Sequence, residues 1–73
     1  MNTPDSLVKA VIQATKNAEN LKQGPVFVLD VQKAFVKINQ GNSSALDIKN
    51  VLYDLHRNDK ILADEEMNRF SFD

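Results

Sequence analysis

Few residues of this 73-residue chain have the chemistry of a catalytic or metal-binding site. His56 is the only histidine, so a metal bound by it would have no second histidine ligand. There is no cysteine, so a thiolate metal site is not available. Asp64, Glu65 and Glu66 form an acidic run without the oxygen-ligand spacing of a calcium loop. No glycine-rich phosphate loop or nucleophile motif occurs. We therefore expect a non-enzymatic protein without metal or cofactor, in which His56 and the acidic run are solvated.

The charged side chains are distributed unevenly. Residues 1–60 carry eight Lys or Arg against six Asp or Glu, a balance of +2, whereas residues 61–73 carry one arginine against four acids, a balance of −3. A strongly basic chain would indicate nucleic-acid binding from charge alone, and this chain, with a net charge of −1, is not one. Such a function must come from where individual side chains are placed.

Length and hydropathy predict one small domain, residues 1–73, that buries only about 60% of its unfolded surface. No apolar run approaches the roughly 18 residues that span a bilayer, and the N-terminus does not resemble a secretory signal. We expect a soluble, cytoplasmic protein with no membrane partner.

A first helix is predicted over about residues 4–22, with the segment Thr3–Ser6 as its start. Apolar residues recur at spacings of three and four and form one stripe: Leu7, Val11, Ala14, Ala18 and Leu21. Val8 and Ile12 make this stripe wider than one small core usually requires. The helix is therefore either wedged between two others or shared with a second subunit, in a homodimer that uses Val8 and Ile12.

Gly24 and Pro25 are predicted to end this helix, with Gly24 in a left-handed conformation. A short strand at about 26–28 and a second helix over about 30–39, beginning at Asp30, follow. The second helix has a predicted buried face of four residues: Val31, Ala34, Phe35 and Ile38. Lys33 and Lys37 point away from that face.

A third helix is predicted over about residues 45–58, because Ser44–Asp47 has the form of a capping box. Its predicted buried stripe is Ile48, Val51, Leu52 and Leu55. At 100° per residue, four residues fall on the opposite side: Leu46, Asn50, Tyr53 and Arg57. Lys49, Asp47 and Asp54 flank them.

The third helix is predicted to end in a left-handed turn at Asn58–Asp59. A hairpin over about residues 60–72 follows, with a loop near residues 65–68. Its inward-facing residues are predicted to alternate: Ile61, Ala63, Phe70 and Phe72. We expect one core that contains Val11, Phe35, Leu52, Leu55 and Phe70.

The order of these elements resembles the winged helix-turn-helix superfamily over nearly the whole chain. The segments that carry the resemblance are the strand VFV, the helices DVQKAFVKI and SALDIKNVLYDL, and the hairpin KILADEEMNRFSF. In particular, IKNVLYDLHRNDKI resembles a recognition helix that leads through a left-handed turn into the first wing strand, although Asp59 stands where glycine is commoner. The resemblance implies a mostly helical α+β fold with three helices, a short strand and a C-terminal β-hairpin wing.

The resemblance also implies a transcriptional regulator that places its third helix in the major groove of double-stranded DNA. Asn50 would then pair with adenine and Leu46 would touch a thymine methyl group. Tyr53 would donate a further hydrogen bond. Four cations would hold phosphates: Lys33, Lys37, Lys49 and Arg57.

A second function stays open, because Asp47, Asp54 and the acidic hairpin tip would repel a DNA backbone. Leu46, Tyr53 and Arg57 would equally suit an interface with a protein, where tyrosine and arginine are enriched. We therefore expect either weak or partner-dependent DNA binding, with the hairpin held clear of phosphate, or a protein-interaction module that binds no nucleic acid. A continuous positive strip joining Lys33, Lys37, Lys49 and Arg57 would favour DNA.

Overall fold

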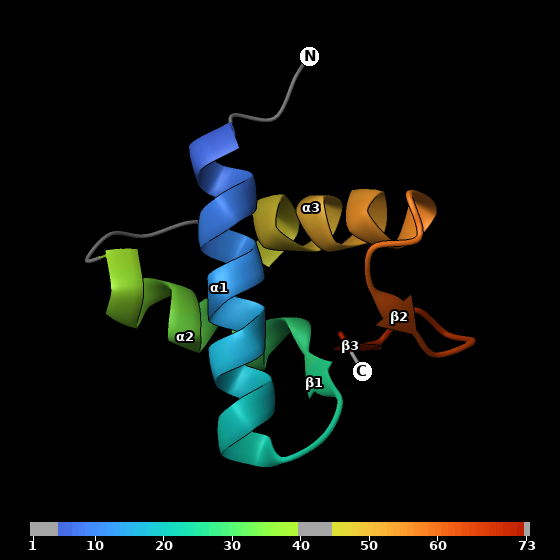
Figure 1. The fold of residues 1–73 in the computed structure, drawn as a ribbon, viewed down its shortest axis with the longest axis horizontal. Helices are drawn as coiled ribbons and strands as arrows, with labels where there is room; N and C mark the ends of the chain where they lie inside the picture. Colours follow the sequence, from blue (N-terminus) through green and yellow to red (C-terminus); the bar gives the residue numbers. More distant parts are fainter. Residues whose placement is uncertain (1–4, 40–44, 73) are drawn as a thin grey trace.

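A computed structural model describes residues 5–39 and 45–72. Its elements follow the chain in the order α1 (Asp5–Lys22), β1 (Val26–Phe27), α2 (Val28–Asn39), α3 (Ala45–Arg57), β2 (Leu62–Ala63) and β3 (Arg69–Ser71) (Figure 1). The predicted mostly helical α+β architecture with a C-terminal hairpin is confirmed. The predicted helix start at Thr3 and Pro4 and the predicted cap at Ser44 lie outside the described residues.

Helix α1 packs against both α2 and α3, and it crosses α3 at a steep angle (Figure 1). Its wide apolar face is therefore used largely within one chain. Val11 and Ala14 are fully buried, and Val8 and Ile12 are half-buried against the core. The packing agrees with the wedged arrangement, and the homodimer through Val8 and Ile12 stays a prediction.

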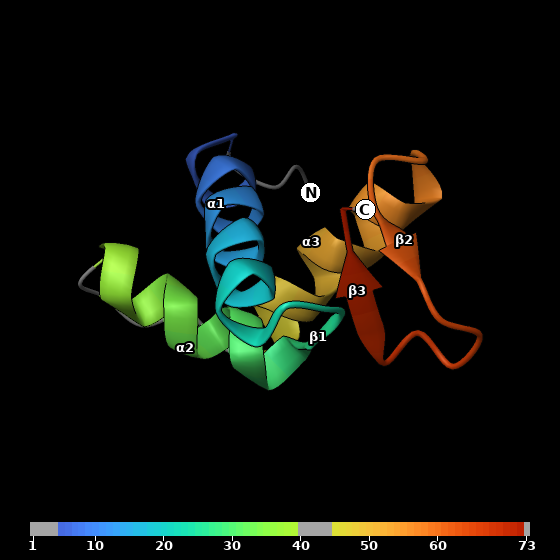
Figure 2. The same ribbon diagram turned by 60° about the horizontal axis from the view of Figure 1, so that its bottom comes forward.

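The three strands form one antiparallel sheet in the order β1-β3-β2. Phe70 of the central strand pairs with Val26 of β1 and with Ala63 of β2, and its side chain is fully buried. The sheet therefore ties the segment before α2 to the C-terminal hairpin. We call the hairpin, residues 62–71, the wing; its loop projects from the body of the molecule (Figure 2).

The five residues expected to share one core do so: Val11, Phe35, Leu52, Leu55 and Phe70 belong to a single buried cluster. The four predicted stripe residues of α3 are all buried as well. Two apolar predictions are wrong. Leu21 is 80% exposed and Ile38 is 40% exposed, because both stand beside an open groove between α1 and α2 that no described element covers.

Two predicted helix boundaries need correction. Gln23, not Gly24, has the left-handed conformation, with a φ of 59°, and its N–H donates to the carbonyl oxygen of Glu19 at 2.7 Å. Helix α2 begins at Val28 rather than at Asp30. The Asp30 carboxylate accepts the N–H of Phe27 at 3.0 Å, so Asp30 reaches back from the first turn instead of preceding it.

The end of α3 agrees with the prediction, since Asp59 is left-handed with a φ of 58°. His56 differs from the solvated side chain that we expected. It is half-buried, and its Nδ1 lies 3.1 Å from the carbonyl oxygen of Ile61. His56 therefore helps to hold the turn that leads from α3 into the wing.

Candidate nucleic-acid interface

The candidate interface is the side of α3 that faces away from the core. We call it the α3 outer face, and it consists of Leu46, Lys49, Asn50, Tyr53 and Arg57. Four of these are exposed, and Leu46 is 64% exposed although it is apolar. The face exists because the opposite side of the helix is buried along its whole length.

Tyr53 is the least accessible residue of this face. Its ring packs against Phe70 of the wing, with the ring centroids 6.2 Å apart, and Lys49 Nζ lies 5.3 Å from its ring centroid. The sequence predicted Tyr53 on the exposed side, and the structure places it at the junction of α3 and the sheet. Its ring therefore serves packing, and the residue is only partly buried.

Two carboxylates reduce the positive charge beside this face. Arg57 Nη2 lies 3.4 Å from Asp54 Oδ1, one turn away on the same helix. Both side chains are more than half exposed, so this pair contributes little to stability but partly neutralises Arg57. Asp47 lies exposed in the first turn of α3. Lys49 is thus the cation of this face with no ion pair to a described residue.

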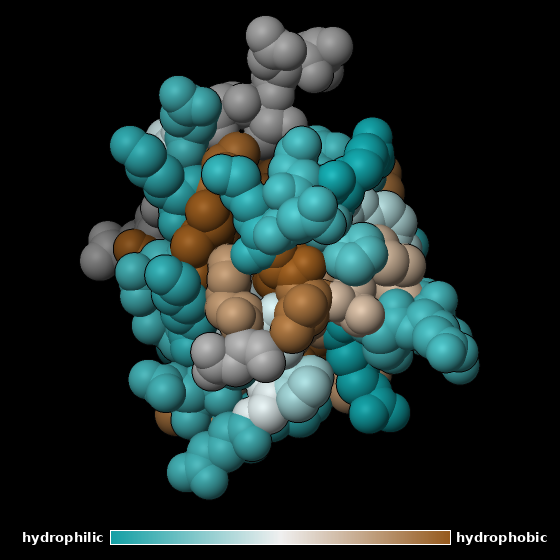
Figure 3. Space-filling view, turned by 45° about the vertical axis from the view of Figure 1, so that its right-hand side comes forward, coloured by the Kyte–Doolittle hydropathy of each residue, from teal (hydrophilic) through white to brown (hydrophobic). Residues whose placement is uncertain are grey.

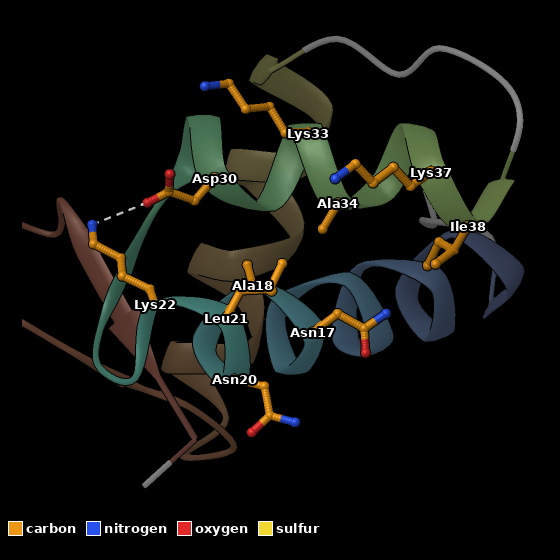
Figure 4. Close-up of a pocket in the computed structure, with 10 residues that line it drawn as sticks. All are labelled: Asn17, Ala18, Asn20, Leu21, Lys22, Asp30, Lys33, Ala34, Lys37 and Ile38. Carbon is orange, nitrogen blue, oxygen red and sulfur yellow. Dashed lines mark hydrogen bonds and ion pairs between the residues drawn. The ribbon is translucent and has the colours of Figure 1, made fainter.

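Lys33 and Lys37 do not join this face. They line the groove between α1 and α2, together with Asn17 and Asn20 from α1, and no described residue of α3 lines it (Figure 4). In this view α3 passes behind both helices. Of the four cations that the resemblance assigned to phosphate contacts, two line this groove and two belong to the α3 outer face, and a continuous positive strip through all four stays a prediction.

The wing tip is built around one of its acids. Asp64 Oδ1 accepts the N–H groups of Asn68 at 2.7 Å and of Arg69 at 3.1 Å, and Met67, which precedes them, is left-handed. These hydrogen bonds lower the pKa of Asp64 from its ordinary value. Asp64 is exposed, as expected of a solvated acidic run, and its carboxylate also shapes the loop.

The cation of the wing points to the sheet rather than to the tip. Arg69 lies over the ring of Phe27 at 5.5 Å, and Lys22 approaches the same ring at 4.3 Å. Lys22 also pairs with Asp30 at 3.2 Å. Sequence reasoning missed this cluster, although an acid at the third position of α2 and the pairing of Phe27 with Arg69 connect its members.

A shallow depression lies where α1 meets the C-terminal half of α3. Val8 and Ile12 line it with Val51 and Leu55, and polar residues form its edge: Asp54, Asn58 and Lys60. Figure 3, turned toward the wing side of the molecule, shows hydrophobic surface gathered in the middle of that side and hydrophilic side chains around it. Val8 and Ile12 are only partly buried, so they keep some accessible area for the predicted homodimer.

Within residues 5–39 and 45–72 there is no group of three or more His, Asp or Glu side chains that could hold a metal ion. Every buried side-chain polar atom there has a partner; Thr15, for example, donates to the carbonyl oxygen of Val11 at 2.7 Å. None of the described helices has the length and apolar character to cross a membrane.

Comparison of the chain with protein-family models, with characterised proteins and with solved structures finds no match.

Proposed function

We propose that this chain is a small winged-helix DNA-binding protein, a transcriptional regulator that inserts the α3 outer face into the major groove of double-stranded DNA. The observation that carries the proposal is the exposure of Leu46, Lys49 and Asn50 in the N-terminal half of a helix whose other side is buried. An α-helix fits the major groove, and recognition helices contact bases with their N-terminal residues.

Each residue of the face has a distinct role in this proposal. The Asn50 amide donates to and accepts from an adenine edge, and Leu46 packs against a thymine methyl group. Lys49 and Arg57 contact phosphates, which position the helix without reading sequence. Arg57 must exchange its carboxylate partner Asp54 for a phosphate, which is a small change for an exposed ion pair.

The surrounding charges support modest affinity. Lys33 and Lys37 line the groove between α1 and α2, so the α3 outer face itself has two cations, Lys49 and Arg57. Glu65 and Glu66 lie exposed at the wing tip and repel a phosphate backbone that comes within about 10 Å at 0.1 M salt. The wing therefore stays clear of DNA, in contrast to a wing with a basic tip.

A second function is favoured by the same charges. Arg57 is paired to Asp54, and Asp47 in the first turn of α3 offsets the charge of Lys49, so the α3 outer face is close to neutral. Its apolar and aromatic members, Leu46 and Tyr53, suit a protein partner. A protein-interaction module with no nucleic acid is therefore the alternative.

Four alanine substitutions, measured by fluorescence anisotropy on pools of labelled duplexes, test the proposal. Asn50→Ala should cost about 1–3 kcal/mol on the preferred sequence and little on others, because base contacts discriminate. Lys49→Ala should weaken binding to all sequences alike. The double variant Lys33→Ala/Lys37→Ala is the matched control and should bind as the unmodified protein does. Equal losses from the control and from Lys49→Ala would refute this assignment of the DNA-binding surface.

A further inference from the structure

The groove between α1 and α2 combines an apolar floor with a basic edge. It has a volume of about 770 Å³ and is open along one side (Figure 4). Ala18 of α1 and Ala34 of α2 lie at its floor, and their small side chains leave room between the two helices. Leu21 and Ile38, 80% and 40% exposed, lie beside them. These two side chains are among the exposed large apolar residues of the described chain.

The charges along the groove are mainly positive. Lys33 and Lys37 stand one turn apart on α2, about 6 Å along the helix axis, and neither pairs with a described acid. Lys22 lies at one end and is paired to Asp30, the acid among the lining residues. The Phe27 N–H, Lys22 and, as the last of these causes, the charge of Lys33 lower the pKa of Asp30, so its carboxylate stays ionised while its ion pair is with Lys22. Two lysines thus remain for an incoming ligand.

We propose that the α1–α2 groove binds an acidic amphipathic helix of a partner protein. Such a helix lays apolar side chains at i, i+3 and i+4 into a groove, where here they would cover Leu21 and Ile38. Asp or Glu at i and i+4 along its edge would meet Lys33 and Lys37, which have the same spacing. The groove runs from Asp30 to Ile38 on α2, about 12 Å, which corresponds to two to three turns of a helical ligand.

Two other occupants fit the groove less well. A DNA backbone would satisfy the lysines but leave Leu21 and Ile38 uncovered. The acidic wing of a second copy offers a tight loop in which Asp64 is already engaged by backbone N–H groups and Met67 packs against its own core. Neither therefore brings apolar side chains and carboxylates together in the pattern that the groove presents.

The proposal does not depend on DNA binding by α3. No described residue of the α3 outer face lines the groove, so a partner helix and a duplex would occupy separate surfaces. Binding of a peptide to the groove can accordingly be measured without DNA, and its failure would leave the α3 proposal untouched.

The test is an NMR titration of the ¹⁵N-labelled full chain with a synthetic peptide. The peptide is an amphipathic helix with leucines on one face and glutamates at i, i+4 along each edge; a second peptide has lysine in place of every glutamate. We expect the acidic peptide to shift the amide signals of groove residues such as Ala18, Leu21 and Ala34, in a saturable manner. The basic peptide should not.

Substitutions inside and outside the groove then test whether the peptide binds there. Lys33→Glu/Lys37→Glu should weaken the acidic peptide about tenfold at low salt, and Lys9→Glu/Lys60→Glu, with the same change in net charge outside the groove, should leave it within about twofold. Leu21→Gln should also weaken binding, and because Leu21 is 80% exposed this variant keeps the fold.

Three results would overturn the proposal. The first is equal binding of the acidic and basic peptides, or of the two charge-reversed variants. The second is a duplex that shifts the groove signals, since Lys33 and Lys37 would then hold phosphates. The third is a concentration-dependent shift of the groove signals in the protein alone, which would make a second copy the occupant.

Discussion

Two helices of this chain end in a left-handed residue that is not glycine, although glycine adopts this conformation most easily. Gln23 ends α1 in a left-handed conformation beside a glycine that does not. Asp59 does the same after α3. For a residue with a Cβ atom this conformation costs roughly 1–2 kcal/mol, whereas glycine adopts it without strain. Backbone strain of this kind is a local property, and it can be tested one residue at a time.

Two neighbouring substitutions distinguish which residue is strained. Gln23→Gly should raise the free energy of unfolding by about 0.5–1 kcal/mol, because the relief of strain exceeds the added entropy of the unfolded chain. Gly24→Ala should be tolerated or slightly stabilising, since a Cβ atom at position 24 meets no atom within 4 Å and the φ there is not positive. Urea unfolding of both variants checks this. A clear destabilisation by Gly24→Ala would indicate that Gly24, and not Gln23, is left-handed.

At the scale of elements, the wing depends on a carboxylate rather than on a glycine turn. The Asp64 carboxylate holds the N–H groups of Asn68 and Arg69. Its pKa lies below the ordinary value of 3.8 in the folded protein. A lowered folded-state pKa means that the stabilisation is fully present above the unfolded value and is lost as the pH falls through the folded value.

Substitutions at Asp64 should therefore have effects that depend on pH. At pH 7, Asp64→Asn keeps an acceptor oxygen but loses the charge, and it should unfold at a lower temperature than the unmodified protein; Asp64→Ala should unfold at a lower temperature still. Below the folded pKa the difference between the unmodified protein and the Asp64→Asn variant should vanish. Glu65→Gln removes an equal charge that makes no hydrogen bond to a described residue, and serves as the control. Thermal melts at pH 7 and below the folded pKa measure these differences. The prediction is contradicted if the melting temperatures of the unmodified protein and of Asp64→Asn differ by the same amount at both pH values.

The sequence predicted which side of each helix is apolar, but not which of these sides another element covers. The spacing of Ile48, Val51, Leu52 and Leu55 predicted the buried side of α3 in full, because helical periodicity depends on the chain alone. The same rule failed for Leu21 and Ile38, since it identifies an apolar face but not whether another element covers that face. The sequence could not predict that Lys33 and Lys37 line the groove between α1 and α2, because how α2 is rotated relative to its neighbouring helices is decided by tertiary packing.

At the scale of the whole molecule, the proposed activities lie on separate surfaces that one small core supports. The α3 outer face would hold DNA, and the α1–α2 groove would hold a partner helix. The net charge of −1 and the acidic wing make any DNA contact dependent on a few cations. The number of cations that contact phosphate therefore determines how strongly salt weakens DNA binding.

The most direct test is the salt dependence of binding to duplex DNA, measured by fluorescence anisotropy at several salt concentrations. With Lys49 and Arg57 as the two phosphate contacts, the logarithm of the binding constant should fall against the logarithm of salt concentration with a slope of about −2. Lys49→Ala should reduce this slope by about one unit. A slope of about −4 would mean that Lys33 and Lys37 also hold phosphates, which would contradict the proposal that only Lys49 and Arg57 do so. Absence of saturable binding even at low salt would contradict the proposal that this protein binds DNA.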